Sequence, residues 1–230
     1  MKKKQTIAQT VSPPARYAAW LKFVFDRPLT PNGWYFDLNE PDFEGSATEI
    51  AELVACTLEN CGRDLAGYSD AQVYHGLSYI FNNACSNTVF ALMDEAVPAA
   101  LRLRAIAAIK VLYRDCFTPG CAPVLGHLDE PGANALNPIC YMLWDMSPLG
   151  HWEGRNDKVE FYGAVVEVME EALTSDNPAC VESALHGLGH AQPYFTDKVV
   201  TVISAFQRRN VYVSPLLKNY AQYAHGGCVQ

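Results

Sequence analysis

Charge is scarce in this sequence. Of its 230 residues, 17 are Lys or Arg and 25 are Asp or Glu, so charged residues make up 18% of the chain, below the roughly 25% of a typical soluble domain. Half of the residues are hydrophobic, which is enough to bury a sizeable core and excludes a globally disordered chain. The length suits one domain, and we expect a single domain over residues 1–230.

An excess of positive charge is also missing, because the formal net charge is −8. A nucleic-acid-binding surface needs a basic field, so we expect no nucleic-acid partner, and acidity of this size favours basic partners. No run approaches the roughly 18 uninterrupted apolar residues of a membrane span, and polar residues follow Met1–Lys4 where a signal peptide would have an apolar core. These absences predict a cytoplasmic protein without a membrane segment.

The signatures of common enzymes and of β-sheets are absent as well. The sequence has no Gly-x-Ser-x-Gly elbow, no phosphate-binding Gly-Lys loop and no dinucleotide-binding fingerprint. No run alternates apolar and polar residues as a half-buried strand would. We therefore expect an all-α protein, and we favour a non-catalytic role without a cofactor.

Eight cysteines are present, and we interpret them as reduced core thiols of a cytosolic protein. Two Cys-x4-Cys pairs, Cys56/Cys61 and Cys116/Cys121, have a spacing that a zinc site permits. Each pair is flanked by apolar helical sequence, and residues five apart diverge by about 140° around a helix. Burial in the core is the favoured interpretation over zinc.

Helical signals recur along the chain, starting with a helix expected over 15–25. Five residues mark further expected helix starts: Ser46, Ser69, Asp176, Thr196 and Ser214. Pro98 suits the first turn of a long helix that is apolar nearly all round. Five of the 14 prolines fall in 118–154, where only short helices at 122–128 and 138–144 are expected.

The tripeptide His-Gly-Leu occurs twice, at 75–77 and at 186–188. The copies lie 111 residues apart, which equals three periods of 37, close to the period of two-helix solenoid repeats. In both copies an amphipathic helix precedes the tripeptide, which indicates an internal repeat.

The segment Asp176–His190 resembles a helix of the HEAT and armadillo-like α-solenoids, with a capped start, small residues and leucines at helical spacing. The resemblance covers 156–225 well and 46–117 loosely, and it does not cover 118–154. It implies a right-handed superhelix of stacked antiparallel helix pairs with a groove for a partner, and it implies no chemistry. The expected parts are an N-terminal helix with an aromatic loop (1–45), helical hairpins (46–117), an irregular insertion (118–154) and HEAT-like helices (155–230).

We expect this helical module to bind another protein through its groove or its aromatic loops, since aromatic side chains dominate binding hot spots. The candidate contact residues are Trp34, Tyr35, Phe36, Tyr141, Trp144 and Trp152. One alternative is an immunity or inhibitor protein whose acidity complements a basic toxin. The sequence leaves the oligomeric state open.

A second alternative is a metal-dependent enzyme centred on the second His-Gly-Leu copy. Glu182, His186 and His190 are spaced by four, so one helix face presents all three, and two imidazoles at this spacing reach one metal ion. Water or His225 could complete the shell. Against this, Gly187 stands where a zincin has its glutamate, and the His-Glu pairs of HEAT-like di-iron hydroxylases are missing. We favour hydrogen bonding of His186 to a neighbouring helix, with His190 near a helix C-terminus.

Several cations fall on the expected long helix after Pro98. Arg102, Lys110 and Arg114 would form a basic strip if no carboxylate neutralised them. Because acidic residues outnumber basic ones, intramolecular ion pairing is the favoured interpretation.

Overall fold

A computed structural model of the protein describes residues 12–30, 33–37, 39, 42–209 and 214–229. The described residues form helices, turns and loops and contain no strand, which confirms the all-α prediction. None of the described helices has the length and hydropathy needed to span a membrane. Residues 1–4, which bear on the absence of a signal peptide, lie outside the described residues.

The first half of the chain contributes the helices at one end of the molecule. They are α1 (Tyr17–Phe25), η1 (Trp34–Phe36), α2 (Ala47–Glu59), α3 (Cys61–Asp64), α4 (Asp70–Phe81), η2 (Thr88–Leu92) and α5 (Ala99–Leu112). Helix α5 contacts α2 on one side and α9 on the other. This double contact explains why α5 is apolar nearly all round.

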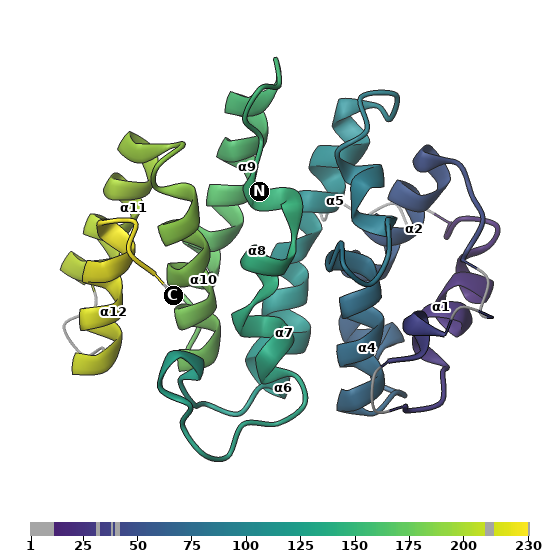
Figure 1. Ribbon diagram of the computed structural model, residues 1–230, viewed down its shortest axis with the longest axis horizontal. Helices are drawn as coiled ribbons and strands as arrows, with labels where there is room; N and C mark the ends of the chain where they lie inside the picture. The colour runs from purple at the N-terminus through teal and green to yellow at the C-terminus, as the bar shows by residue number, and fades with distance from the viewer. Residues whose placement is uncertain (1–11, 31–32, 38, 40–41, 210–213, 230) are drawn as a thin grey trace, which may run out of the picture.

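The second half begins with short elements and ends with four long helices. They are η3 (Tyr113–Phe117), α6 (Thr118–Gly120), η4 (Gly126–Leu128), α7 (Asn137–Tyr141), α8 (Leu143–Met146), η5 (Pro148–Gly150), α9 (Lys158–Ala172), α10 (Pro178–Ala191), α11 (Thr196–Arg209) and α12 (Pro215–His225). Helix α10 contacts α7, α8, α9, α11 and α12. Figure 1 shows the helices in a row that largely follows the chain, with α1 near one end and α12 at the other.

Side-chain caps set several helix starts where the sequence places them. The Ser46 hydroxyl accepts a hydrogen bond from the Glu49 amide at 3.2 Å, Ser69 forms a full capping box, and Ser214 caps α12. The predicted cap Asp176 is one residue early. Asn177 caps α10 instead, because Pro178 occupies the first helical position and the capping residue directly precedes it.

The proline-rich segment 118–154 folds as loops and short helices, held by buried amides. The helix expected over 122–128 is reduced to the three residues of η4. The Asn137 side chain accepts a hydrogen bond from the Ala122 amide and donates one to its carbonyl oxygen, and Asn177 donates to two further carbonyl oxygens. These bonds satisfy backbone groups that have no helical partner.

The two His-Gly-Leu copies make equivalent contacts. His75 Nδ1 lies 3.3 Å from the Tyr35 hydroxyl, and His186 Nδ1 lies 2.6 Å from the Tyr220 hydroxyl. In each copy the histidine is thus held by a tyrosine from another part of the chain. The predicted hydrogen bond between His186 and a neighbouring helix is confirmed.

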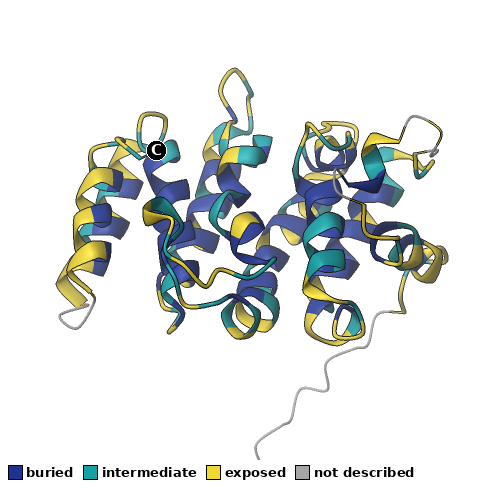
Figure 2. Cartoon of the chain, turned by 60° about the horizontal axis from the view of Figure 1, so that its bottom comes forward, coloured by how far each residue is buried: buried dark blue, intermediate teal, exposed yellow. Residues whose placement is uncertain are grey.

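The glycine of each copy lets an aromatic ring approach the helix closely. A Cβ atom on Gly76 would lie 2.2 Å from the Phe25 ring, and one on Gly187 would lie 2.5 Å from the Trp144 ring. Both leucines of the motif are fully buried: Leu77 and Leu188. Figure 2 shows buried residues on the faces where helices meet and exposed residues on the outer faces and loops.

Candidate metal centre

Three of the six aromatic residues expected on an interaction surface are core residues. Trp34, Trp144 and Trp152 are 6%, 3% and 0% exposed, so the folded protein does not offer them to a partner. The Trp144 indole donates to the Tyr113 hydroxyl at 2.9 Å. Large aromatic surfaces gain most from burial, which explains this placement.

The other three aromatic candidates are more accessible. Tyr35 and Tyr141 are half-buried, and Phe36 is 54% exposed. Their hydroxyl groups and rings nevertheless contact neighbouring side chains, since Tyr35 bonds His75 and packs against Phe36. Tyr35, Phe36 and Tyr141 therefore remain partly accessible, whereas the three tryptophans belong to the core.

The expected basic strip is neutralised by carboxylates, as we favoured. Three ion pairs account for its members: Arg102 with Asp157 at 3.1 Å, Lys110 with Glu171 at 3.5 Å, and Arg114 with Asp115 at 2.6 Å. Arg102 is also buried, and its guanidinium lies over the Phe161 ring. Each of these cations thus has a carboxylate partner within the chain.

All eight cysteines are free thiols. Among the described residues, the thiols do not converge into groups of three or more metal-ligating side chains. Five of them are buried: Cys56, Cys61, Cys121, Cys140 and Cys180. This placement agrees with core packing as the favoured interpretation of the Cys-x4-Cys pairs.

Glu182 does not join the two histidines with which the sequence grouped it. Its carboxylate is 1% exposed and accepts hydrogen bonds from the amides of Gly126 and His127 at 2.7 and 3.0 Å. The His127 ring nitrogen also contacts it. A buried carboxylate requires such partners, and here the loop before α7 supplies them.

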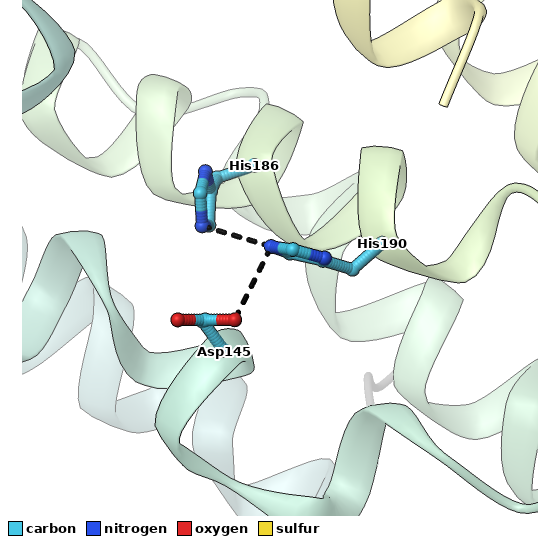
Figure 3. Close-up of side chains that lie close together, drawn as sticks. All are labelled: Asp145, His186 and His190. Atoms are coloured by element: carbon cyan, nitrogen blue, oxygen red, sulfur yellow. Dashed lines mark hydrogen bonds and ion pairs between the residues drawn. The ribbon is translucent and has the colours of Figure 1, made fainter. Parts of the chain in front are cut away.

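Asp145 takes the place beside the histidines. His186 and His190 lie one turn apart on α10, and their Nε2 atoms are 3.1 Å apart. Asp145, from α8, places a carboxylate oxygen 3.5 Å from His190 Nε2. Figure 3 shows the three side chains converging from two helices, and their ligand atoms all lie within 4.8 Å of one another.

These separations match those of metal ligands. Two atoms that each lie about 2.0–2.1 Å from one zinc ion in tetrahedral geometry are separated by about 3.3–3.4 Å. The observed distances of 3.1 and 3.5 Å lie on either side of this value. The third separation, between the ligand atoms of Asp145 and His186, is at most 4.8 Å, so side-chain rotations would have to close it to the same value to bring the three atoms to bonding distance of one ion.

Close packing of α8 on α10 creates this convergence. Trp144 packs against Gly187, where a side chain would collide with its ring. Asp145 follows Trp144 directly and is thereby brought to the face of α10 that carries both histidines. The sequence contains no spacing that would reveal this partner, because Asp145 is 41 residues before His186.

Burial differs among the three residues and controls their charge. His186 is 1% exposed, whereas the side chains of His190 and Asp145 are 37% and 43% exposed. Burial, followed by the neighbouring His190, lowers the pKa of His186 to about 4. His186 is therefore neutral at physiological pH, which is the form that ligates a metal ion.

A pocket of about 360 Å³ lies beside the three residues. Its lining includes Asp145 and His190, together with His151, Tyr194 and Asn83. None of the described residues that line it is a lysine or an arginine. Two of the three candidate ligands are thus open to a small molecule, while His186 anchors the group from the interior.

No protein-family model, curated protein or solved structure matches the chain. The convergence of Asp145, His186 and His190 is the feature with the most definite chemistry.

Proposed function

We propose that this protein binds one divalent transition-metal ion through Asp145 and the Nε2 atoms of His186 and His190. The observation that carries the proposal is the convergence of the three ligand atoms within 4.8 Å. Two imidazoles and one carboxylate form a donor set that suits zinc and iron(II). The exposure of Asp145 and His190 to the pocket gives the ion a path of entry.

Hydrolysis is the chemistry that this arrangement supports best. Three protein ligands leave at least one coordination position for water, which is the pattern of catalytic zinc sites. A bound metal ion lowers the pKa of such water and makes it a nucleophile at neutral pH. The adjoining pocket of about 360 Å³ would hold a small substrate or one side chain of a larger one.

The lining of the pocket indicates which substrates it favours. Asp145 is the one Asp, Glu, Lys or Arg among the described lining residues, and Tyr194, Asn83 and Ser147 supply hydroxyl and amide groups. An anionic substrate would find no lysine or arginine among these lining residues to offset its charge. We therefore propose a neutral ester or amide as the substrate class.

Metal titration tests the proposal with a control built into the chain. We expect the metal-free protein to bind one equivalent of Co²⁺ or Zn²⁺, and the variants Asp145→Asn, His186→Ala and His190→Ala to lose at least about tenfold in affinity. His75→Ala is the matched control, since His75 holds the equivalent place in the first motif copy. Circular dichroism establishes that each variant is folded.

Two outcomes would contradict the proposal. The first is the absence of stoichiometric metal binding by the unaltered protein. The second is an equal loss of affinity in His75→Ala, which would show that the effect comes from the fold and not from the three ligands.

A second candidate function is protein binding by a helical-repeat module. We propose that the helices form a HEAT/armadillo-like stack and that the outer face of α12 contacts a partner. The net charge of −8 favours a basic partner, such as a basic toxin. Leu216 and Tyr223 favour this candidate, since they are 44% and 59% exposed and lie two turns apart on α12 at the end of the row (Figure 1). The test is chemical cross-linking of the protein to a basic protein partner. If Leu216→Glu loses the cross-linked complex while its Tm is unchanged, the result supports this candidate function, and if the variant retains the complex, the result contradicts it.

A further inference from the structure

Tyr220 contacts the proposed metal centre at His186 Nδ1, the ring nitrogen that is not a proposed ligand. Its hydroxyl lies 2.6 Å from His186 Nδ1, and its side chain is buried at 3% exposure. The hydroxyl of Tyr141 lies 3.3 Å from that of Tyr220. A chain of polar atoms therefore runs from His190 through His186 and Tyr220 to Tyr141.

Packing fixes the position of the Tyr220 ring. The His127 ring stacks on it with centroids 4.3 Å apart. His127 is in turn held by Glu182, whose carboxylate also binds the backbone of the same loop. Glu182 thus acts on the centre indirectly, through the loop and Tyr220, although it offers no ligand atom to the site.

The Tyr220 hydroxyl is linked to the tautomer of His186, that is, to which ring nitrogen carries the proton. A neutral imidazole carries one N–H and one lone pair, so binding a metal ion through Nε2 requires the proton on Nδ1. In that form Nδ1–H donates to the Tyr220 oxygen, and the Tyr220 O–H donates to the Tyr141 oxygen. Without a metal ion the same contacts permit the reverse order, in which Tyr220 donates to Nδ1 and His186 Nε2–H donates to His190 Nε2.

A hydroxyl suits both states because it donates and accepts. A backbone carbonyl at the same place would accept only, so it could bond Nδ1 in just one of the two tautomers. Metal-ligating histidines characteristically donate their other N–H to a second group, and loss of that group costs about 10–100-fold in affinity. Tyr220 and Tyr141 together provide such a group here.

We infer that Tyr220 is the positioning residue of the metal centre, which sets the orientation and the tautomer of His186 and passes the hydrogen bond on to Tyr141. This inference rests on the proposed function. The first motif copy provides an internal comparison, since Tyr35 holds His75 at 3.3 Å but Tyr79 stands where the second copy has His190. The contact with tyrosine is thus shared, and only the second copy combines it with further ligands.

Cobalt titration of tyrosine variants tests the inference. We expect Tyr220→Phe to bind Co²⁺ about 10–100-fold more weakly than the unaltered protein, with an altered visible absorption spectrum because His186 is no longer held in one orientation. Tyr141→Phe removes the next bond of the chain and should give a smaller loss in the same direction. Tyr35→Phe is the matched control and should leave affinity and spectrum unchanged.

The outcomes separate this inference from the proposed function. If the unaltered protein binds Co²⁺ and Tyr220→Phe binds it equally well with the same spectrum, the inference is overturned and the proposed function stands. An equal loss in Tyr35→Phe would also overturn it. If the unaltered protein binds no Co²⁺, the proposed function fails and the inference fails with it. Should Tyr220→Phe not fold, the comparison of Tyr141→Phe with Tyr35→Phe decides the matter.

Discussion

The substitution Gly187→Ala should disturb the metal centre through a single added methyl group. The new Cβ would lie 2.5 and 2.6 Å from two carbons of the Trp144 ring and 2.7 Å from the end of Met169. Ordinary contacts between carbon atoms begin at about 3.5 Å, so the ring has to move by about 1 Å. Because Asp145 follows Trp144 in the chain, its carboxylate moves away from His190.

The expected magnitudes follow from two opposing effects on stability. Overpacking of this kind costs about 1–3 kcal/mol, whereas alanine in place of glycine within a helix gains about 1 kcal/mol. We expect a net loss of about 0–2 kcal/mol in the free energy of unfolding. Metal affinity should fall more clearly, by at least about tenfold, since metal-ligand distances tolerate deviations of only about 0.2 Å.

The assay compares Gly187→Ala with Gly163→Ala. A Cβ on Gly163, which lies on α9, would meet no atom within 4 Å, so this variant should gain about 1 kcal/mol from helix propensity alone. Urea unfolding of both metal-free variants isolates the clash with Trp144 as the difference between them. The reasoning is refuted if Gly187→Ala is stabilised as much as Gly163→Ala and binds Co²⁺ like the unaltered protein.

Two further predictions concern the remainder of the fold. Gly76→Ala places a Cβ 2.2 Å from the Phe25 ring, so it should lower the free energy of unfolding by about 1–3 kcal/mol. Metal affinity should stay the same, and a change in affinity would contradict the independence of the two motif copies. Burial tends to raise the pKa of Asp157, but hydrogen bonds from Arg155 and Arg102 outweigh it, and the net shift is downward. The stabilisation from this carboxylate is therefore present above its unfolded pKa of about 3.9 and is lost as the pH falls below that value. Urea unfolding at pH 7 and at pH 3 should show a smaller dependence on pH for Asp157→Asn than for the unaltered protein, and equal dependences would argue against the ion pair.

Helix starts were predictable because they depend on neighbouring residues. Ser46, Ser69 and Ser214 cap helices where the sequence places them, since a capping hydroxyl bonds an amide two or three residues away. The spacing of four residues likewise predicts that His186 and His190 share one helix face. The misplaced cap Asp176 shows the usual uncertainty of one residue at a helix boundary.

Tertiary packing decided what the sequence did not show. Glu182 and His190 lie on one face of α10, but that face meets the loop at η4 beside Glu182 and meets α8 beside His190. The two neighbours come from the irregular segment 118–154, whose path the periodicity of the sequence does not define. Asp145 therefore emerged only from the structure, and so did Tyr220, which comes from α12 and contacts His186 on α10. The same holds for Trp144, whose sequence context in a proline-rich segment gave no sign of burial.

The location of a bound metal ion tests the central claim most directly. Anomalous diffraction at the zinc absorption edge, from crystals grown with Zn²⁺, measures the position of the ion independently of any change in stability. We predict a single strong peak about 2.0–2.1 Å from His186 Nε2, His190 Nε2 and an oxygen of Asp145. Two results would contradict the proposed metal centre. One is a zinc peak elsewhere in the protein with none between these three atoms, and the other is no zinc peak at all.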